Sequence, residues 1–205
     1  MKILIVAMFS YLLGSIPTSF IFAKLLKGID IREHGSGNVG ATNLLRTVGK
    51  VPGAIALILD VLKGVIPVVF FSQLLLSVSP SMNLALIQVM LGLLAVCGHI
   101  WTPFLRFKGG KGVATTIGVF IGLDPFITLY SLLIWCIFVF LFKYISLGSI
   151  SMAVSLVIQM YIFNKPYEYT ILSIILCIAI CYRHKSNITR IINGEEPKVG
   201  SKSSK

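Results

Sequence analysis

Long apolar runs dominate this sequence and decide what it can fold into. The runs from Ile3 to Leu26 and from Phe126 to Phe142 are examples, and only 12% of the 205 residues are charged. A soluble domain carries about 25% charged residues. In lipid every backbone polar group must be satisfied within the protein, so only helices or a closed barrel can form. A barrel needs segments of about ten residues with alternating polarity; these runs are continuous, so the sequence predicts helices.

The apolar runs predict an all-α integral membrane protein, a bundle of about seven transmembrane helices in one domain covering residues 1–205. The predicted spans are Ile3–Leu26, Val51–Val78, Asn83–Leu105, Val113–Leu123, Phe126–Phe142, Ile145–Phe163 and Tyr169–Tyr182. The fourth would reach only about 16 Å, against a hydrocarbon core of about 30 Å. It is either a short span buried among other helices or part of one kinked unit over 112–142, interrupted at Asp124-Pro125. The short polar tail, about 199–205, is predicted to be disordered.

The basic residues fall on alternate connections, and this predicts the orientation. All but three of the 18 Lys and Arg residues lie in or beside segment 27–50, segment 106–111, the turn at Lys143 and the tail from Arg183; the exceptions are Lys2, Lys63 and Lys165. Because loops rich in Lys and Arg face the cytoplasm, we expect the N-terminus outside and the C-terminus cytoplasmic. A net charge of +11 could also indicate nucleic-acid binding. The one-sided placement favours topology, and no nucleic-acid partner is expected.

The spacing of the potential ligand residues does not support a metal or cofactor site. The four cysteines, at positions 97, 136, 177 and 181, all lie inside apolar runs and lack the paired loop spacing of a zinc site. No His, Asp and Glu residues recur with metal-ligand spacing. We therefore expect no metal and no cofactor.

A glycine-rich segment from His34 to Arg46 is the first place where chemistry could occur. It contains a formal G-x-G-x-x-G between Gly35 and Gly40. A dinucleotide fingerprint requires a preceding strand in a βαβ unit, whereas the flanks here are membrane helices, so this interpretation is excluded. Exposed amides beside hydroxyl, carboxamide and guanidinium groups suit a phosphate. The alternative is an ordinary polar connector.

A second glycine-rich segment runs from Arg106 to Thr116. Lys111 is followed by glycine rather than Ser or Thr, so the segment is not a Walker A loop. Two lysines and three glycines that open a helix still make a suitable phosphate site, because helix amides and the positive helix N-terminus attract anions. A turn that merely obeys the charge rule would explain the lysines but not the glycines.

Other polar residues lie in or next to apolar runs. Asp60 and Lys63 are three residues apart and can pair, and Lys63 falls near mid-bilayer, where ionisable groups are costly and usually functional. A structural ion pair and a site role both remain open for Lys63. His99 is expected to hydrogen-bond between helices. His184 and Asn187 would share one face of a helix.

Five segments, taken in order, resemble one known family. They are GSGNVGATNLLR (35–46), DVLKG (60–64), GHIWTPFLRFKGGKGVATT (98–116), SLGS (146–149) and RHKSNITRIINGEEPKVG (183–200). Together they resemble the bacterial acyl-phosphate:glycerol-3-phosphate acyltransferase family, often called PlsY, over essentially the whole chain. The resemblance implies a seven-helix membrane enzyme that moves a fatty acyl group from acyl phosphate to the 1-hydroxyl of glycerol 3-phosphate. Lysophosphatidic acid and phosphate would be the products, in the first acylation of bacterial phospholipid synthesis.

The resemblance also implies roles for individual residues. Three are expected to be catalytic: Ser36, His184 and Asn187. The expected substrate-binding residues are Asn38, Asn43, Arg46, Lys63, Lys108, Gly109, Gly110, Lys111, Gly112, Thr115 and Ser146, with Lys63 added from its position in the bilayer. Glu196 is expected to be structural. Whether His184 or the phosphate of the substrate accepts the hydroxyl proton is left open.

The expected partners are glycerol 3-phosphate, a long-chain acyl phosphate and the lipid bilayer. The protein is expected to be a monomer in the bacterial cytoplasmic (inner) membrane, with its active site facing the cytoplasm. Two other function classes fit the basic segments. One is a transporter or channel for a phosphorylated anion, and the other is a membrane subunit that binds lipid without catalysis.

The predicted orientation can be tested by labelling single cysteines in whole cells, in a background that lacks the four native cysteines. Cysteines placed at positions 40 and 198 should resist a membrane-impermeant reagent, because both positions lie in basic, cytoplasmic segments. A cysteine in the outer connection Ser79–Met82 is the positive control. Labelling at position 40 or 198 would overturn the topology.

Overall fold

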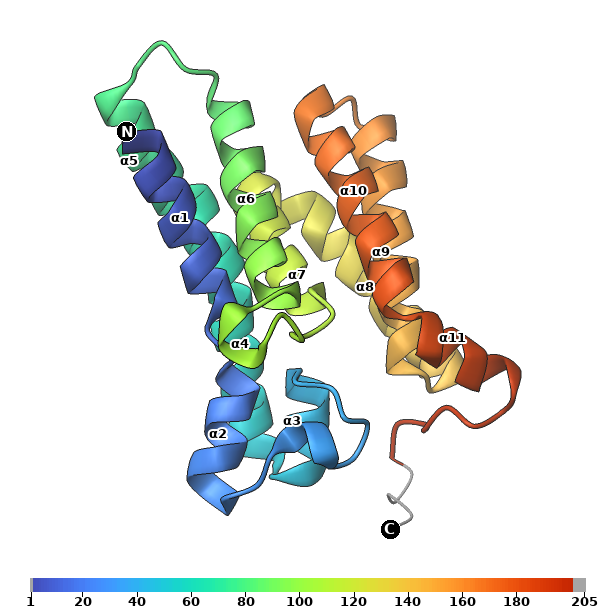
Figure 1. Cartoon of the computed structure of the whole chain (residues 1–205). Coiled ribbons are helices and arrows are strands. Elements are labelled where there is room, and N and C mark those ends of the chain that lie inside the picture. Colours follow the sequence, from blue (N-terminus) through green and yellow to red (C-terminus); the bar gives the residue numbers. More distant parts are fainter. Residues whose placement is uncertain (1, 201–205) are drawn as a thin grey trace. The chain divides into compact units, whose positions relative to one another are not determined.

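Every regular element among the described residues, 2–200, is helical in this computed structural model (Figure 1). The chain divides into two compact units, Met1–Leu123 and Asp124–Lys205, which we call the N-terminal and C-terminal units. The all-helical prediction is confirmed for the described residues. The single domain stays a prediction. Of the tail predicted to be disordered, residues 201–205 lie outside the described range, while the Val199 amide donates to the Lys143 carbonyl (2.8 Å).

The described part of the N-terminal unit, from residue 2 onward, holds ten helical elements. In chain order they are α1 (Lys2–Ser15), α2 (Thr18–Lys27), the 3₁₀ turn η1 (Ile31–Glu33), α3 (Ala41–Thr47), α4 (Lys50–Ile66), the π-helical segment η2 (Pro67–Phe71), α5 (Ser72–Val78), α6 (Leu84–Ile100), the 3₁₀ turn η3 (Pro103–Leu105) and α7 (Val113–Leu123). The π-helical turns begin at Pro67, which lacks the N–H that a regular α-helix would bond to Lys63. The helix nevertheless continues from Lys50 to Val78.

Within residues 2–200, four helices are long and apolar enough to cross a membrane: Lys50–Val78, Leu84–Leu105, Pro125–Phe142 and Ile145–Ile162. Two bent pairs of helices, Lys2–Ser15 with Thr18–Lys27 and Tyr167–Arg183 with Lys185–Ile192, raise the number to six if each pair is one span. Val113–Leu123 is a shorter apolar helix, with the bounds that the sequence predicts. The described residues thus hold four to six candidate spans, and the number seven stays a prediction.

Glycines bring the helices of the N-terminal unit into backbone contact. A β-carbon on Gly14 of α1 would lie 2.1 Å from the Ala95 carbonyl oxygen of α6, and one on Gly98 would lie 2.2 Å from the Tyr11 oxygen. A β-carbon on Gly64 of α4 or on Gly118 of α7 would likewise collide with the backbone of the facing helix. Small residues allow this close approach, which drives helix association in membranes where lipid removes the hydrophobic force.

The first predicted span is broken at Ile16-Pro17, where α1 and α2 meet at 41°. Proline disfavours helix in the residue before it and has no N–H to donate. The break leaves the Ile16 carbonyl without a helical partner, and the Lys63 ammonium from α4 donates to it. This interruption of the single run Ile3–Leu26 is where the structure differs from the sequence prediction.

The C-terminal unit consists of α8 (Pro125–Phe142), α9 (Ile145–Ile162), α10 (Tyr167–Arg183) and the short α11 (Lys185–Ile192). Helix α9 packs against both α8 and α10 (Figure 1). Large apolar side chains on α8 are exposed about once per turn, at Leu129, Leu133, Ile137 and Phe140. An apolar helix face without a protein partner is what a lipid-facing helix shows.

Candidate active site

The first glycine-rich segment is organised by the buried side chain of Asn43. Its Nδ2 donates to the carbonyls of His34 and Asn38 (both 2.9 Å) and of Ile31 (3.2 Å), and its Oδ1 accepts from the Ser36 amide (3.0 Å). A β-carbon on Gly35 would lie 2.3 Å from that Oδ1. Asn43, predicted to bind substrate, thus uses its amide group to shape the turn that presents Ser36. Ser36 itself is exposed.

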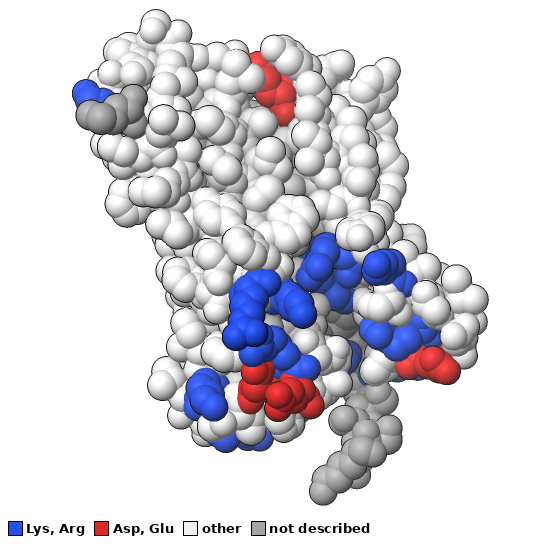
Figure 2. Space-filling view, in the orientation of Figure 1, with Lys and Arg blue, Asp and Glu red and all other residues white. Residues whose placement is uncertain are grey.

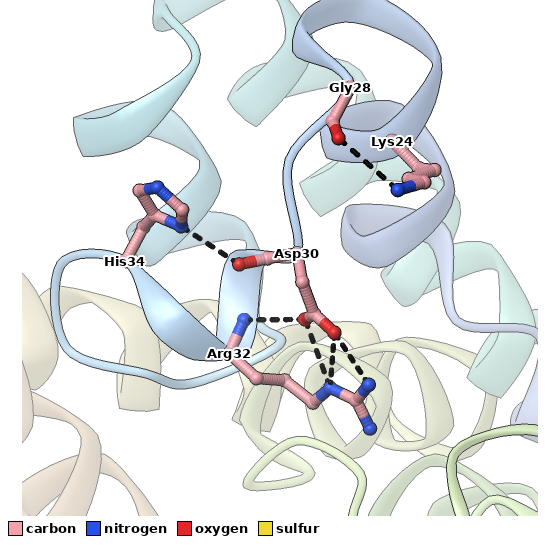
Figure 3. A network of polar contacts seen from close by, with 5 residues as sticks. All are labelled: Lys24, Gly28, Asp30, Arg32 and His34. Carbon is pink, nitrogen blue, oxygen red and sulfur yellow. Dashed lines mark hydrogen bonds and ion pairs between the residues drawn. The ribbon is translucent and has the colours of Figure 1, made fainter.

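Asp30 holds the start of the same segment in place through hydrogen bonds with Arg32 and His34 (Figure 3). The Arg32 guanidinium donates to both carboxylate oxygens of Asp30, from Nε at 3.0 and 3.1 Å and from Nη2 at 2.6 Å, and the His34 ring donates from Nδ1 to the Asp30 carbonyl (2.9 Å). The side-chain hydrogen bond from Arg32 lowers the pKa of Asp30 to about 2. Arg32 is therefore neutralised within the protein.

Arg46 and Lys108 differ from Lys27 and Arg32, whose side chains have partners in the protein. Both are exposed, and among the described residues neither side chain has a hydrogen bond or an ion pair; the same holds for Lys50 and Arg106. Lys27, by contrast, donates to the Thr47 carbonyl (2.6 Å). Figure 2 shows Lys and Arg side chains gathered on the part of the N-terminal unit that carries α2 and α3, while the surface over α1 and α6 is mostly white. Unpaired cations at this end of the unit are available to an anion.

The second glycine-rich turn is attached to the C-terminal end of α6. The Gly109 amide donates to the Ile100 carbonyl and the Gly110 amide to the His99 carbonyl (both 3.0 Å). These bonds satisfy two carbonyls that the end of a helix would leave without partners. A β-carbon on Gly109 would lie 2.1 Å from the His99 oxygen. The amides of these two glycines therefore serve the fold, which differs from the expectation that they face a phosphate.

Helix α7 begins directly after this turn. Gly112 precedes it with a φ of +82°, a left-handed conformation that glycine adopts at little cost. The hydroxyl oxygens of Thr115 and Thr116, in the first turn of α7, are buried and have no hydrogen-bond partner among the described residues. Thr115, predicted to bind substrate, thus carries an unpartnered polar atom at a positive helix N-terminus.

The predicted Asp60–Lys63 pair is confirmed. The two side chains form a buried ion pair, and the Thr18 hydroxyl donates to Asp60 Oδ1 (2.6 Å) and accepts from Lys63 (3.1 Å). With the Ile16 carbonyl, Lys63 has three partners in the protein. These three contacts are typical of a structural residue. Substrate binding by Lys63 stays a prediction.

In the C-terminal unit the polar residues converge on the Glu196 carboxylate. Its Oε1 accepts from the Ser146 hydroxyl and from Asn187 Nδ2 (both 2.7 Å), and its Oε2 accepts from Arg190 Nε (2.8 Å). Ser146, Asn187 and Glu196 are buried. Burial acts to raise the pKa of Glu196, but the hydrogen bonds from Asn187, Ser146 and Arg190 outweigh it and lower that pKa below its ordinary value. The cluster joins the start of α9, α11 and the chain after it.

His184 is buried at the junction of α10 and α11. Its ring Nδ1 lies 2.8 Å from the Ile180 carbonyl oxygen. Because a carbonyl can only accept, Nδ1 carries the proton, and in the neutral ring Nε2 holds the lone pair. A catalytic role for His184 stays a prediction.

The structure brings Ser36, Asn38 and Asn43 together in one loop, and Ser146 and Asn187 together through Glu196. It also places three residues outside the predicted site, Thr18, Asp60 and His99, beside Gly109 and Gly110 around a small cavity of about 10 Å³. The proline at position 17 was the available signal, because a broken span needs polar partners for its freed backbone. Among the described residues no group of three or more His, Cys, Asp or Glu could hold a metal.

Comparisons with known proteins agree with one another. The family model for glycerol-3-phosphate acyltransferase matches residues 4–194. Proteins of that name from Desulforamulus reducens and from Prochlorococcus marinus (strain MIT 9312) are 46% and 44% identical, over 94% and 97% of this chain and 93% and 98% of their own lengths.

Two solved structures are also similar. Crystal structures of PlsY, an integral membrane glycerol 3-phosphate acyltransferase, match in a glycerol 3-phosphate form and in a lysophosphatidic acid form, with TM-scores of 0.88 and 0.84. Their sequence identities to this chain are 38% and 37%. The matches cover 98% and 97% of this chain and 96% and 95% of the matched chains.

The Glu196 cluster predicts an acid-sensitive contribution to stability. We expect Glu196→Gln to lower the free energy of unfolding at neutral pH by about 1–3 kcal/mol, because a buried donor loses its acceptor. Since the folded pKa is depressed, the wild-type advantage is complete above the ordinary glutamate pKa of 4.5 and disappears as the pH falls through the folded pKa.

Thermal unfolding in detergent at neutral and acidic pH measures this difference. The exposed neighbour Glu195 supplies the control, because Glu195→Gln should leave the unfolding temperature unchanged. An equal loss for Glu196→Gln at every pH would contradict the electrostatic account.

Proposed function

The chain belongs to the glycerol-3-phosphate acyltransferase family, and from this membership we propose that it transfers a fatty acyl group from acyl phosphate to the sn-1 hydroxyl of glycerol 3-phosphate. It is an integral membrane acyltransferase, so an enzyme rather than the anion transporter or lipid-binding subunit that its basic segments also fit. The observation that carries the proposal is an exposed cation in each glycine-rich segment, Arg46 and Lys108, whose side chains have no hydrogen bond or ion pair among the described residues.

The proposed reaction needs no nucleophile from the enzyme. Acyl phosphate is a mixed anhydride, and the glycerol oxygen attacks its carbonyl carbon. The new ester C–O bond forms as the bond from the carbonyl carbon to the phosphate oxygen breaks, and phosphate leaves with the electron pair. The enzyme must hold two anions together against their repulsion and stabilise the oxyanion that forms at the carbonyl.

Phosphate binding is assigned to the N-terminal unit. Arg46 can offer its planar fork to a phosphate, and Lys108 adds a point charge. The start of α7, with Lys111, Gly112 and the Thr115 hydroxyl, supplies a helix N-terminus and a buried donor without a partner. Ser36 and Asn38 are assigned to the same task from the loop that Asn43 shapes.

Positioning and deprotonation of the glycerol hydroxyl are assigned to residues of the C-terminal unit. His184 Nδ1 donates to the Ile180 carbonyl, and Nε2 is assigned as the nitrogen that accepts the hydroxyl proton. Asn187 and Ser146 are held by Glu196 in one geometry, which supports a positioning role. A pH–rate profile of His184→Gln that keeps the wild-type acidic limb would instead assign the proton to the phosphate of the substrate.

The donor is proposed to be an acyl phosphate rather than an acyl-CoA. Both formal glycine motifs lack the strand or the residues that a nucleotide site requires, and the polar segments that join the apolar helices are short. An apolar helix bundle can accept the acyl chain from the bilayer, with about 0.8 kcal/mol from each buried methylene. The small phosphate headgroup then needs only the basic end of the protein.

We place the enzyme in the bacterial cytoplasmic membrane as a monomer, with the whole chain acting as one domain. Seven spans with the N-terminus outside are proposed, with the bent helix pairs counted as single spans and Val113–Leu123 as a short one. The basic residues around α2, α3 and the α6–α7 connection support a cytoplasmic active site. Glycerol 3-phosphate is found on that side.

Removing either unpartnered cation should weaken phosphate binding. We expect Arg46→Ala and Lys108→Ala to lose about 2–4 kcal/mol of transition-state stabilisation, comparable to the loss of an oxyanion donor. Steady-state kinetics with both substrates measures the loss as the ratio of kcat/KM values. Lys50→Ala is the matched control, because Lys50 is also an exposed cation without a partner among the described residues. Wild-type kinetics in both test variants would move the phosphate site elsewhere.

The donor can be tested directly with purified protein in detergent. With glycerol 3-phosphate as acceptor, palmitoyl phosphate should support turnover and palmitoyl-CoA should not, since the thioester carries a nucleotide headgroup that the short polar segments cannot hold. Product analysis should place the acyl group at sn-1. Comparable turnover with the thioester, after contaminating enzymes are excluded, would refute the proposed donor.

A further inference from the structure

The imidazole of His99 lies between the Asp60 carboxylate and Gly110 of the second glycine-rich turn. On one side, ring Nδ1 is 3.9 Å from Asp60 Oδ1, within ion-pair range when the ring is protonated. On the other side, ring Nε2 would be only 2.2 Å from a β-carbon on Gly110. The His99 side chain is 9% exposed, so it has little room to move. The ring therefore fills the space beside Gly110 that any larger residue would need.

The backbone of His99 supports the same turn. Its carbonyl accepts the Gly110 amide at 3.0 Å, and the next carbonyl along α6, that of Ile100, accepts the Gly109 amide. The turn that carries Lys108 and Lys111 is thus held against the last turn of α6 by two backbone bonds and one side-chain ring. Of these three contacts, only the ring can be changed by substitution at position 99.

Asp60 restrains the far side of the ring and is itself restrained. Its carboxylate pairs with Lys63 and accepts from Thr18, and Lys63 donates to the Ile16 carbonyl at the break between α1 and α2. A chain of buried contacts therefore runs from that break through α4 to His99 and on to Gly110. In low dielectric such a network is rigid when its members are satisfied.

We infer that His99 is a positioning residue for acyl transfer: its ring, backed by the Asp60–Lys63 pair, sets where the 108–112 turn presents its cations. The inference rests on the proposed role of that turn in binding glycerol 3-phosphate. His99 does not touch substrate in this account. A misplacement of about 1 Å at a substrate-holding group can cost about a hundredfold in rate.

Variants at position 99 separate positioning from folding. We expect His99→Ala to raise the KM for glycerol 3-phosphate by about 10-fold or more, beyond any fall in kcat. A purely structural loss of folded enzyme would lower the apparent kcat and leave KM unchanged. His99→Asn, whose amide can take the place of Nδ1 beside Asp60, should keep the unfolding temperature of the wild type but still show the raised KM, because no ring edge lies against Gly110.

A double-mutant cycle tests the contact itself. Gly110→Ala should be severely impaired, because its methyl group collides with the His99 ring. In a His99→Ala background the same substitution should cost at least ~10-fold less, since the ring is gone. Gly109→Ala is the matched control: a β-carbon there would lie 2.1 Å from the His99 backbone oxygen. That oxygen remains in every variant, so His99→Ala should not rescue Gly109→Ala.

The outcomes distinguish the inference from the proposed function. The role of His99 would be overturned if Gly110→Ala lowered activity equally in the wild-type and His99→Ala backgrounds. It would also be overturned if His99→Ala restored the activity of Gly109→Ala and Gly110→Ala equally. Wild-type KM in Lys108→Ala would instead remove the turn from the substrate site, and the coupling of positions 99 and 110 would still be readable in unfolding temperatures. Non-additivity between 99 and 110, together with a raised KM in His99→Asn, is the supporting result.

Discussion

The structure of the N-terminal unit depends on how it closes a break in its first apolar segment. Lipid offers no hydrogen-bond partner to a backbone carbonyl, and at the break the Ile16 carbonyl accepts from the Thr18 amide (3.0 Å) instead of from a regular helical partner. Lys63 supplies a second donor to this carbonyl from α4, and a buried ammonium in turn requires a counter-charge, which Asp60 provides. The ion pair thus adds to the hydrogen bonding at the bend, and α2 and the first glycine-rich segment follow the bend in the chain.

The same pair links the bend to the second glycine-rich segment through His99. Gly109 and Gly110 are needed because the turn approaches the end of α6 more closely than a β-carbon would allow. Their amides cap α6, which leaves the cations of the turn and the start of α7 for chemistry. Glycine here serves close packing, whereas at Gly112 a left-handed conformation requires it.

In two places a single buried polar side chain organises its neighbours through several hydrogen bonds. Asn43 gathers the loop around Ser36, and Glu196 gathers Ser146, Asn187 and Arg190 in the C-terminal unit. From the sequence, Asn43 is expected to bind substrate and Glu196 to be structural, and both side chains bond to the protein. Their loss would disturb several neighbours at once, because a half-satisfied buried network is less favourable than a complete one.

The sequence by itself determined the helical class, helix α7 to the residue and the family, because hydropathy and motifs are local and the bilayer permits little else. It also predicted the Asp60–Lys63 pair, since residues three apart meet on a helix. Only the tertiary structure decided that Asn43 and Lys63 bind the protein, that the amides of Gly109 and Gly110 cap α6, and that His99 lies against Gly110. These contacts join residues that are distant in sequence or depend on how two helices approach each other, and no local pattern specifies the partner of a buried polar group.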